Sequence, residues 1–146
     1  DWPFGMDHAA FQSFKAAFKQ DPHMTLKRFC YLVTQGGTQA KQDWQHLQCF
    51  IQIEDQLSLL TGLELLERLN VVDILNQYAG HQFHIYSEGD GLVSHKVIDR
   101  MKKLSARFLK VELISGSHGF PVFKYDELSA KISQYIKSKN KNTEKM

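Results

Sequence analysis

Two residues with complementary acid–base chemistry, Asp90 and His118, each stand in a short loop rich in glycine and serine. A carboxylate that accepts a hydrogen bond from one ring nitrogen of a histidine fixes the tautomer and stabilises the imidazolium form. A histidine held in this way can take up and return a proton near neutral pH. The two residues would therefore form a general acid–base pair if the fold brings them together.

The surrounding sequence predicts a strand, a helix and a second strand that would bring Asp90 and His118 together. Residues 83–86 form an apolar, strand-like run, residues 92–104 repeat apolar side chains at helical spacing, and residues 109–114 alternate as a strand does. In a right-handed parallel crossover, the loops after both strands emerge at the carboxyl edge of the sheet, where α/β sites are built. Taken singly, Asp90 could instead cap the helix that begins near Leu92, and His118 could be an incidental loop residue.

The segments around these residues resemble those of a known family. Residues 86–93, YSEGDGLV, and residues 116–121, GSHGFP, look like the acid and histidine segments of the α/β-hydrolases. Residues 62–66 with the following Asp73 are similar to the segment before the acid strand. The stretch 27–43 narrows the resemblance to the pimeloyl-[acyl-carrier protein] methyl ester esterases of biotin synthesis. It covers nearly the whole chain, but only the C-terminal half of such an enzyme.

The resemblance implies a fold and an activity. The fold would be α/β, the C-terminal part of an α/β-hydrolase, with a helical lid and entry segment at 1–55, the end of the core at 56–138 and a polar tail at 139–146. His118 would be the general base of a Ser-His-Asp triad and Asp90 its orienting acid. The serine motif G-x-S-x-G of the family is absent. We therefore expect a cytoplasmic carboxylesterase that needs a missing N-terminal half, no cofactor, and no esterase activity from this chain alone.

The lid-like stretch supplies the other candidate site residues. Phe29 would form a wall of the acyl pocket for a carrier-bound or small ester substrate, although its spacing fits plain core packing equally. Lys27, Arg28 and Lys41 could steer an acidic acyl-carrier protein, or could simply lie on solvated helix faces. Met24 and Gln45 stand where the family carries further basic residues.

Other residues near the pair fit the chemistry less well. Glu88 is an acid close to Asp90, but it does not match the family's position. Ser117, beside His118, is expected to point away from it and is not proposed as a nucleophile. His84 is expected to be structural and His95 exposed. The remaining histidines have no metal-ligand spacing, so no metal site is expected.

The composition excludes several classes of function. With 146 residues, 42% of them hydrophobic and 23% charged, the chain can form one domain with a real core. The net charge is only +2, and lysines at 137–146 contribute much of it, so nucleic-acid binding is not expected. No apolar run is long enough for a membrane span. Cys30 and Cys49 are interpreted as buried free thiols in a reducing compartment.

The helix signals are clear at several points. Asp7 is expected to cap a helix that Asp21 and Pro22 end. Thr25 is expected to start a second helix, which Gly36 and Gly37 stop, and Thr38 to cap a third. The leucine-rich segment 57–69 is apolar on most of its circumference, which predicts a helix sandwiched between other elements. A last helix should open at Asp126.

Only two strands are predicted, and they should be parallel. A parallel pair by itself leaves unpaired edges and uncovered apolar faces, so we expect the chain to self-associate. Two alternatives stay open. The chain could be a non-catalytic hydrolase remnant that binds a partner or dimerises by exchange, or the same half of a C–C hydrolase or a haloperoxidase-like enzyme.

Overall fold

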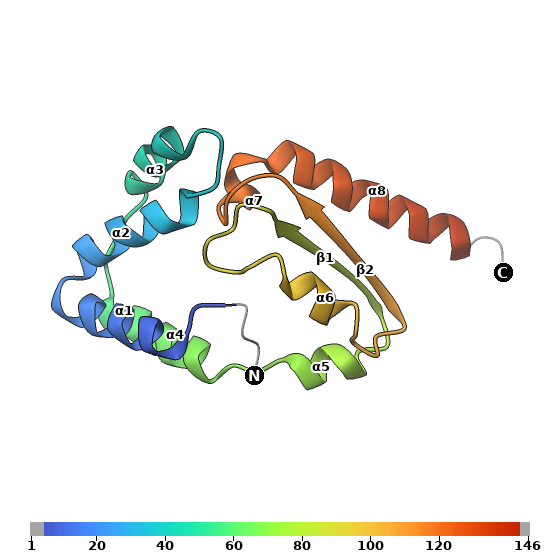
Figure 1. Ribbon diagram of the computed structural model, residues 1–146, viewed down its shortest axis with the longest axis horizontal. Helices are drawn as coiled ribbons and strands as arrows, with labels where there is room; N and C mark the ends of the chain where they lie inside the picture. The colour runs from blue at the N-terminus through green and yellow to red at the C-terminus, as the bar shows by residue number, and fades with distance from the viewer. Residues whose placement is uncertain (1–4, 144–146) are drawn as a thin grey trace.

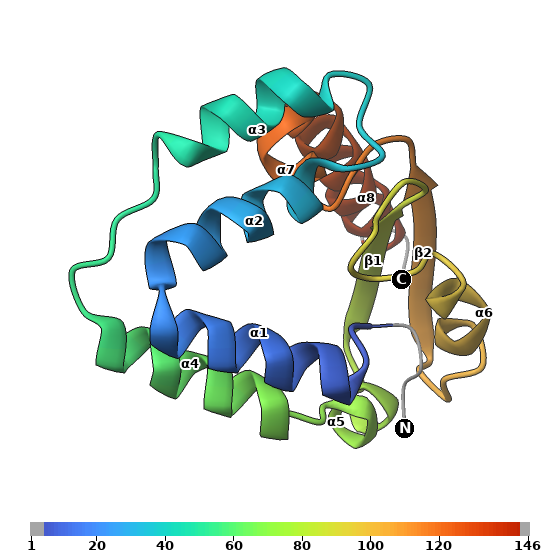
Figure 2. The ribbon, with the colours of Figure 1, turned by 60° about the vertical axis from the view of Figure 1, so that its left-hand side comes forward.

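The polypeptide forms a helical group and an α/β group that face each other across an open ring (Figures 1 and 2). The helical group contains α1 (His8–Gln20), α2 (Pro22–Thr34), α3 (Ala40–Gln48) and α4 (Gln56–Arg68). The α/β group contains α5 (Val72–Gln77), β1 (His81–Ser87), α6 (Val97–Met101), β2 (Phe108–Ile114), α7 (Phe120–Phe123) and α8 (Tyr125–Thr143). The computed structural model describes residues 5–143, with side chains up to residue 140, so residues 1–4 of the predicted lid and entry segment 1–55 lie outside the described residues.

Aspartates set the starts of the first two helices. Asp7 caps α1 as predicted, and its Oδ1 accepts from the Ala10 amide at 2.8 Å. Asp21 ends α1 and also caps α2 by accepting from the Met24 amide at 2.9 Å. Because the Asp-Pro pair serves both helices, α2 begins at Pro22 rather than at the predicted Thr25. The predicted Thr38 cap is wrong as well, since Gln39 stands before α3 without a side-chain cap.

The helix between the strands is much shorter than the segment 92–104 that the apolar spacing predicts. It covers only Val97–Met101, and Val97 and Met101 are buried. The Asp90 side chain accepts from two backbone amides just ahead of it and folds the chain into a turn. A local side-chain bond of this kind competes with the helical backbone pattern, which explains the late start.

The two strands pair in parallel, as predicted, in register from His81↔Phe108 to Ser87↔Ile114. α8 covers one face: Tyr135 stacks on Phe83 with ring centroids 4.5 Å apart, and Lys131 donates to Glu112 at 3.0 Å. α6 lies on the other side of the sheet (Figure 1). The predicted tail 139–146 continues α8 as far as Thr143.

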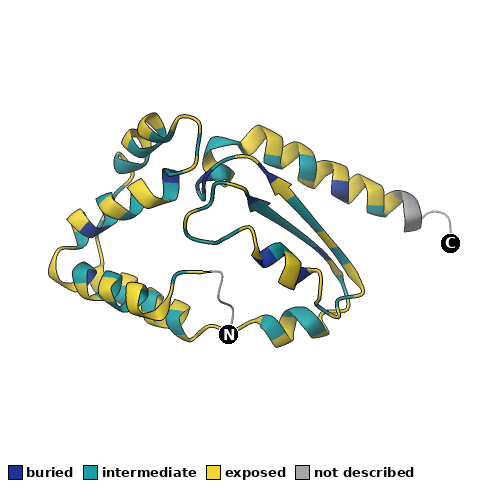
Figure 3. Ribbon diagram, viewed as in Figure 1, coloured by how far each residue is buried: buried dark blue, intermediate teal, exposed yellow. Residues whose placement is uncertain are grey.

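The leucine-rich helix α4 is exposed rather than sandwiched, so that prediction is wrong for the described chain. No residue of α4 is buried, and Leu57 and Leu65 are 74% and 63% exposed. Figure 3 shows the helix in the exposed and intermediate colours only. The helix packs against α1, and this contact leaves most of its leucines exposed.

The exposed leucines lead us to expect concentration-dependent association of the isolated chain. Burying apolar surface is favourable by about 25 cal/mol per Å², so each uncovered leucine favours contact with another surface. Light scattering across a dilution series should show a mass that falls on dilution. Replacing Leu57 and Leu65 together by serine should reduce the association, whereas Val122→Ser on α7 should not. A concentration-independent monomer with a cooperative melt would contradict this expectation.

Two further features of the described residues bear on function. None of the helices within residues 5–143 has the length and apolar character needed to cross a membrane. Over the same range, no three His, Cys, Asp or Glu side chains gather as metal ligands would.

Cys30 and Cys49 are both free thiols. The prediction that both are buried is wrong, since Cys30 is only partly buried and Cys49 is exposed.

Candidate active site

The loops that follow β1 and β2 lie side by side because backbone hydrogen bonds continue beyond the strands. The Glu88 amide donates to the Ile114 carbonyl at 2.9 Å, and the Gly89 amide donates to the Gly116 carbonyl at 2.8 Å. These bonds bring the loops that carry Asp90 and His118 to the same edge of the sheet, as the parallel crossover predicts.

Asp90 and His118 are hydrogen-bonded to each other. The distance from His118 Nδ1 to Asp90 Oδ2 is 2.9 Å. The carboxylate can only accept, so Nδ1 carries the proton and Nε2 of the neutral ring is the proton acceptor. Nε2 has no hydrogen-bond partner among the described residues, and 39% of the His118 side chain is exposed. The imidazole is therefore held by Asp90 through Nδ1, while Nε2 stays available to another group.

The two oxygens of Asp90 have separate partners. Oδ1 accepts from the Leu92 and Val93 amides, both at 2.8 Å, while Oδ2 accepts from His118. Burial raises the pKa of this carboxyl, but the hydrogen bonds from His118, Val93 and Leu92 outweigh it and hold the pKa below its ordinary value. The alternative that Asp90 caps a helix near Leu92 is therefore wrong, because α6 begins only at Val97. The same carboxylate closes a turn through Oδ1 and contacts His118 through Oδ2.

The same contact changes the acidity of the imidazole. The hydrogen bond that His118 donates to Asp90 raises the pKa of His118 above its ordinary value of 6.5, against a smaller opposing effect of burial. Because the pKa is raised, the stabilisation from the charged pair is fully present below pH 6.5 and is lost as the pH rises through the higher value. His118 is accordingly a stronger base than an unpaired histidine.

The rival residues make other contacts. Glu88 is exposed, and its side chain forms no hydrogen bond with the described part of the chain. Ser117 is 3% exposed and packed near Gly37, away from solvent. His84 lies 3.1 Å from the Gln82 amide oxygen, and burial lowers its pKa. His95 is exposed, as predicted.

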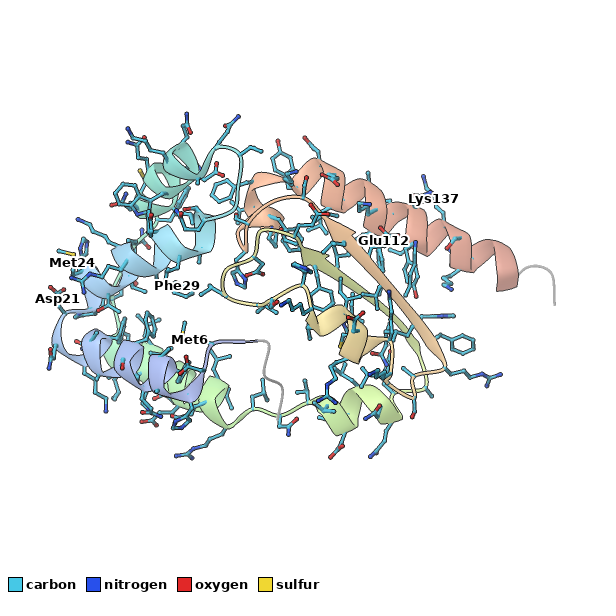
Figure 4. The ribbon with its side chains drawn as sticks, in the orientation of Figure 1. Met6, Asp21, Met24, Phe29, Glu112 and Lys137 are labelled. Carbon is cyan, nitrogen blue, oxygen red and sulfur yellow. The ribbon has the colours of Figure 1, made fainter. Side chains whose placement is uncertain are left out.

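Figure 4 shows Phe29 on the inner side of α2 and Met6 in the segment just before α1. The Phe29 ring is 5.4 Å from that of Phe14, and both residues line an apolar pocket of about 480 Å³ between α1, α2 and α4. The other lining residues are Met6, Phe11, Phe18, Leu26, Ser58, Leu59, Gly62, Leu63 and Leu66. Phe29 therefore packs against a neighbour and also presents a wall to an open apolar space.

The structure brings two of the three candidate cations together. Lys27 and Arg28 border a groove of about 510 Å³ between α2 and α3, whose floor includes Trp44. The Trp44 indole N–H donates to the Lys27 carbonyl at 3.2 Å and ties the two helices together. Lys41 is exposed on α3 and does not line this groove.

Two residues near the site carried no functional signal in the sequence. Ser87 is 1% exposed, and its Oγ has no partner among the described residues. Gly36 reads in the sequence only as a helix stop, yet its backbone contacts the loop of Asp90. Neither role follows from spacing or composition, because both depend on contacts between distant segments.

Comparisons with known proteins show what the chain is similar to in sequence. No protein-family model matches the chain. The pimeloyl-[acyl-carrier protein] methyl ester esterase of Aliivibrio fischeri is 26% identical over 135 residues, which are 90% of this chain and 52% of that protein. A biotin biosynthesis bifunctional protein of Teredinibacter turnerae is 23% identical over 93% of this chain and 24% of its own length. The chain thus spans about half the length, or less, of these curated relatives.

Solved structures give the fold. An esterase from Exiguobacterium antarcticum has a TM-score of 0.75 at 14% identity, covering 92% of this chain and 50% of its own. A bromoperoxidase from Bacillus anthracis has a TM-score of 0.73 at 16% identity, covering 90% and 50%. The chain therefore has the α/β-hydrolase fold of these two enzymes, over about half of each, and its sequence resembles the pimeloyl-[acyl-carrier protein] methyl ester esterases.

Proposed function

We propose that this chain is the C-terminal half of a cytoplasmic serine carboxylesterase and supplies the Asp and His of its Ser-His-Asp triad. The observation that carries the proposal is the hydrogen bond from His118 Nδ1 to Asp90 Oδ2, which leaves Nε2 open toward solvent. The reaction needs a serine and oxyanion-hole donors from a further segment. The two free thiols fit a reducing compartment.

In each half of the reaction, His118 would take up one proton and then return it. His118 Nε2 accepts the serine proton as the serine oxygen attacks the ester carbonyl, and the imidazolium then gives that proton to the departing alkoxide. Asp90 stays ionised throughout, since its pKa is held low, and it stabilises the imidazolium. In the second half of the reaction His118 activates water against the acyl-enzyme in the same way.

The proposed substrate is a methyl ester of an acyl chain on an acyl-carrier protein, with pimeloyl favoured. The sequence likeness to esterases named for that substrate supports this. We propose residues 1–55 as a lid, with Phe29 lining the acyl pocket and with Lys27, Arg28 and Lys41 contacting the carrier. The apolar pocket between α1, α2 and α4 fits an alkyl chain, and the groove beside Lys27 and Arg28 fits an acidic partner.

The test is to complete the enzyme. The chain alone should hydrolyse a p-nitrophenyl ester only at the rate of a His118→Ala control. Fusing an N-terminal half from a relative, with its G-x-S-x-G motif, should give ordinary esterase rates on the p-nitrophenyl ester. The fusion should cleave the carrier-bound pimeloyl methyl ester faster than the p-nitrophenyl ester. Changing the motif serine to alanine in the fusion should abolish both activities.

Two results would count against the proposal. A folded fusion that cleaves neither ester would contradict the assignment of Asp90 and His118. A fusion that cleaves the small ester but not the carrier-bound one would leave the chemistry standing and contradict the substrate. The alternative of a non-catalytic module draws on the exposed leucines of α4, and it requires that the fusion add no activity.

A further inference from the structure

The turn between α2 and α3, residues 35–39, is pressed against the loop that carries Asp90. Gly36 has a φ of +84°, which side-chain-bearing residues rarely adopt, and a Cβ added to it would overlap the carbonyl oxygen of Gly89. A Cβ on Gly89 would lie 2.5 Å from the Gly116 oxygen and 2.6 Å from the Gly36 oxygen. Three backbone segments from distant parts of the chain therefore touch where only glycine fits.

The end of α2 is also bonded to the loop that carries His118. The Gly119 amide donates to the Val33 carbonyl at 2.9 Å. Thr34 is completely buried, and its hydroxyl bonds back to the Tyr31 carbonyl at 3.1 Å, which closes the last turn of α2. Figure 2 shows the segment after α2 running beside the tips of β1 and β2. The helical group is thus joined to both loops of the acid–base pair.

We propose that Gly36 and Gly89 are positioning residues, whose missing side chains let the α2–α3 turn close on both loops and hold Asp90 at hydrogen-bond distance from His118. The loops otherwise depend on two backbone bonds just past the strands. The contact of the α2–α3 turn with both loops is the third interaction, and it fixes their separation. A shift of about 1 Å would take the 2.9 Å contact beyond hydrogen-bond range. The catalytic consequence rests on the proposed function, but the positioning itself does not.

The test measures the pair directly. Gly36→Ala and Gly89→Ala should each move the pKa of His118 back toward 6.5, read from its imidazole resonances by NMR and assigned with His118→Gln. Gly91→Ala is the matched control, because Gly91 adjoins Asp90 but a Cβ there meets nothing within 4 Å. Folded Gly36 and Gly89 variants with an unchanged His118 pKa would overturn the proposal.

Amide exchange in the unmodified chain decides the matter if those variants fail to fold. The Gly119 amide should exchange much more slowly than that of the exposed Gly91, since it is bonded to the Val33 carbonyl at the end of α2. Exchange at Gly119 as fast as at Gly91 would mean that the turn is not docked, and would overturn the proposal.

Steady-state kinetics of the completed fusion give an independent test. Gly89→Ala should lower kcat by at least tenfold with little change in KM, because the base is displaced while the substrate contacts remain. Since the pKa and exchange measurements use no ester, they can succeed even where the esterase assignment fails.

Discussion

Replacing His118 by alanine should lower the kcat of the completed esterase by about 10⁶-fold, as loss of the histidine does in a serine protease. The substitution removes the group that takes the serine proton, and a neutral serine is a weak nucleophile. His118 is the only described histidine hydrogen-bonded to a carboxylate at the sheet edge, so no described neighbour can replace it. The measurement is single-turnover hydrolysis of the p-nitrophenyl ester.

Two controls make this expectation sharp. His95→Gln, at an exposed histidine of the loop after Asp90, should leave kcat within about twofold, as surface changes do. The kcat/KM of the unmodified enzyme should rise with pH through a value above 6.5, because the neutral imidazole is the active form and its pKa is raised. Equal rates for the two variants would remove His118 from the mechanism, whereas a midpoint below 6.5 would contradict the raised pKa of His118.

Changing Asp90 to asparagine should cost about 10⁴-fold in kcat, as the analogous change does in a serine-protease triad. Asparagine keeps an oxygen for the Leu92 and Val93 amides, so the turn should survive and the melting temperature should change little. Its amide N–H₂ would then face Nδ1, which selects the wrong tautomer of His118 and withdraws the charge that stabilises the imidazolium.

Glu88→Gln is the matched substitution, two positions away and exposed to solvent. It should leave kcat within about twofold. Circular dichroism should show both variants folded, so that the difference reports on chemistry. Similar small effects of both changes would refute the role of Asp90 as the orienting acid and reduce it to the turn cap.

The sequence predicted that Asp90 and His118 lie together, because this placement depends only on the strand pattern and on the loop that follows each strand. Strand spacing places residues 83–86 and 109–114 in a parallel pair, and a right-handed crossover places the two following loops at one edge. Apolar spacing overestimated α6, because it does not register that the Asp90 side chain captures the amides of Leu92 and Val93. Hydrophobic pattern and side-chain capping compete there, and capping prevails.

What the sequence missed depends on contacts between distant segments. The leucines of α4 satisfy a rule for buried helices, yet burial is decided by the presence of neighbours, and packing against α1 leaves no residue of α4 buried. The role of Gly36 arises from a close approach to Gly89. No spacing rule relates positions that far apart, so the glycine could only be interpreted as the end of a helix.

The register of the two strands restricts which insertions and deletions this chain could tolerate. Because Ser87 pairs with Ile114, the loops of Asp90 and His118 leave the sheet at the same height. One extra residue within β2 would advance that loop by about 3.3 Å and reverse the face of every later side chain in the strand. Length changes should therefore be tolerated in the connection between α6 and β2, which lies at the opposite end of the strands from the two loops.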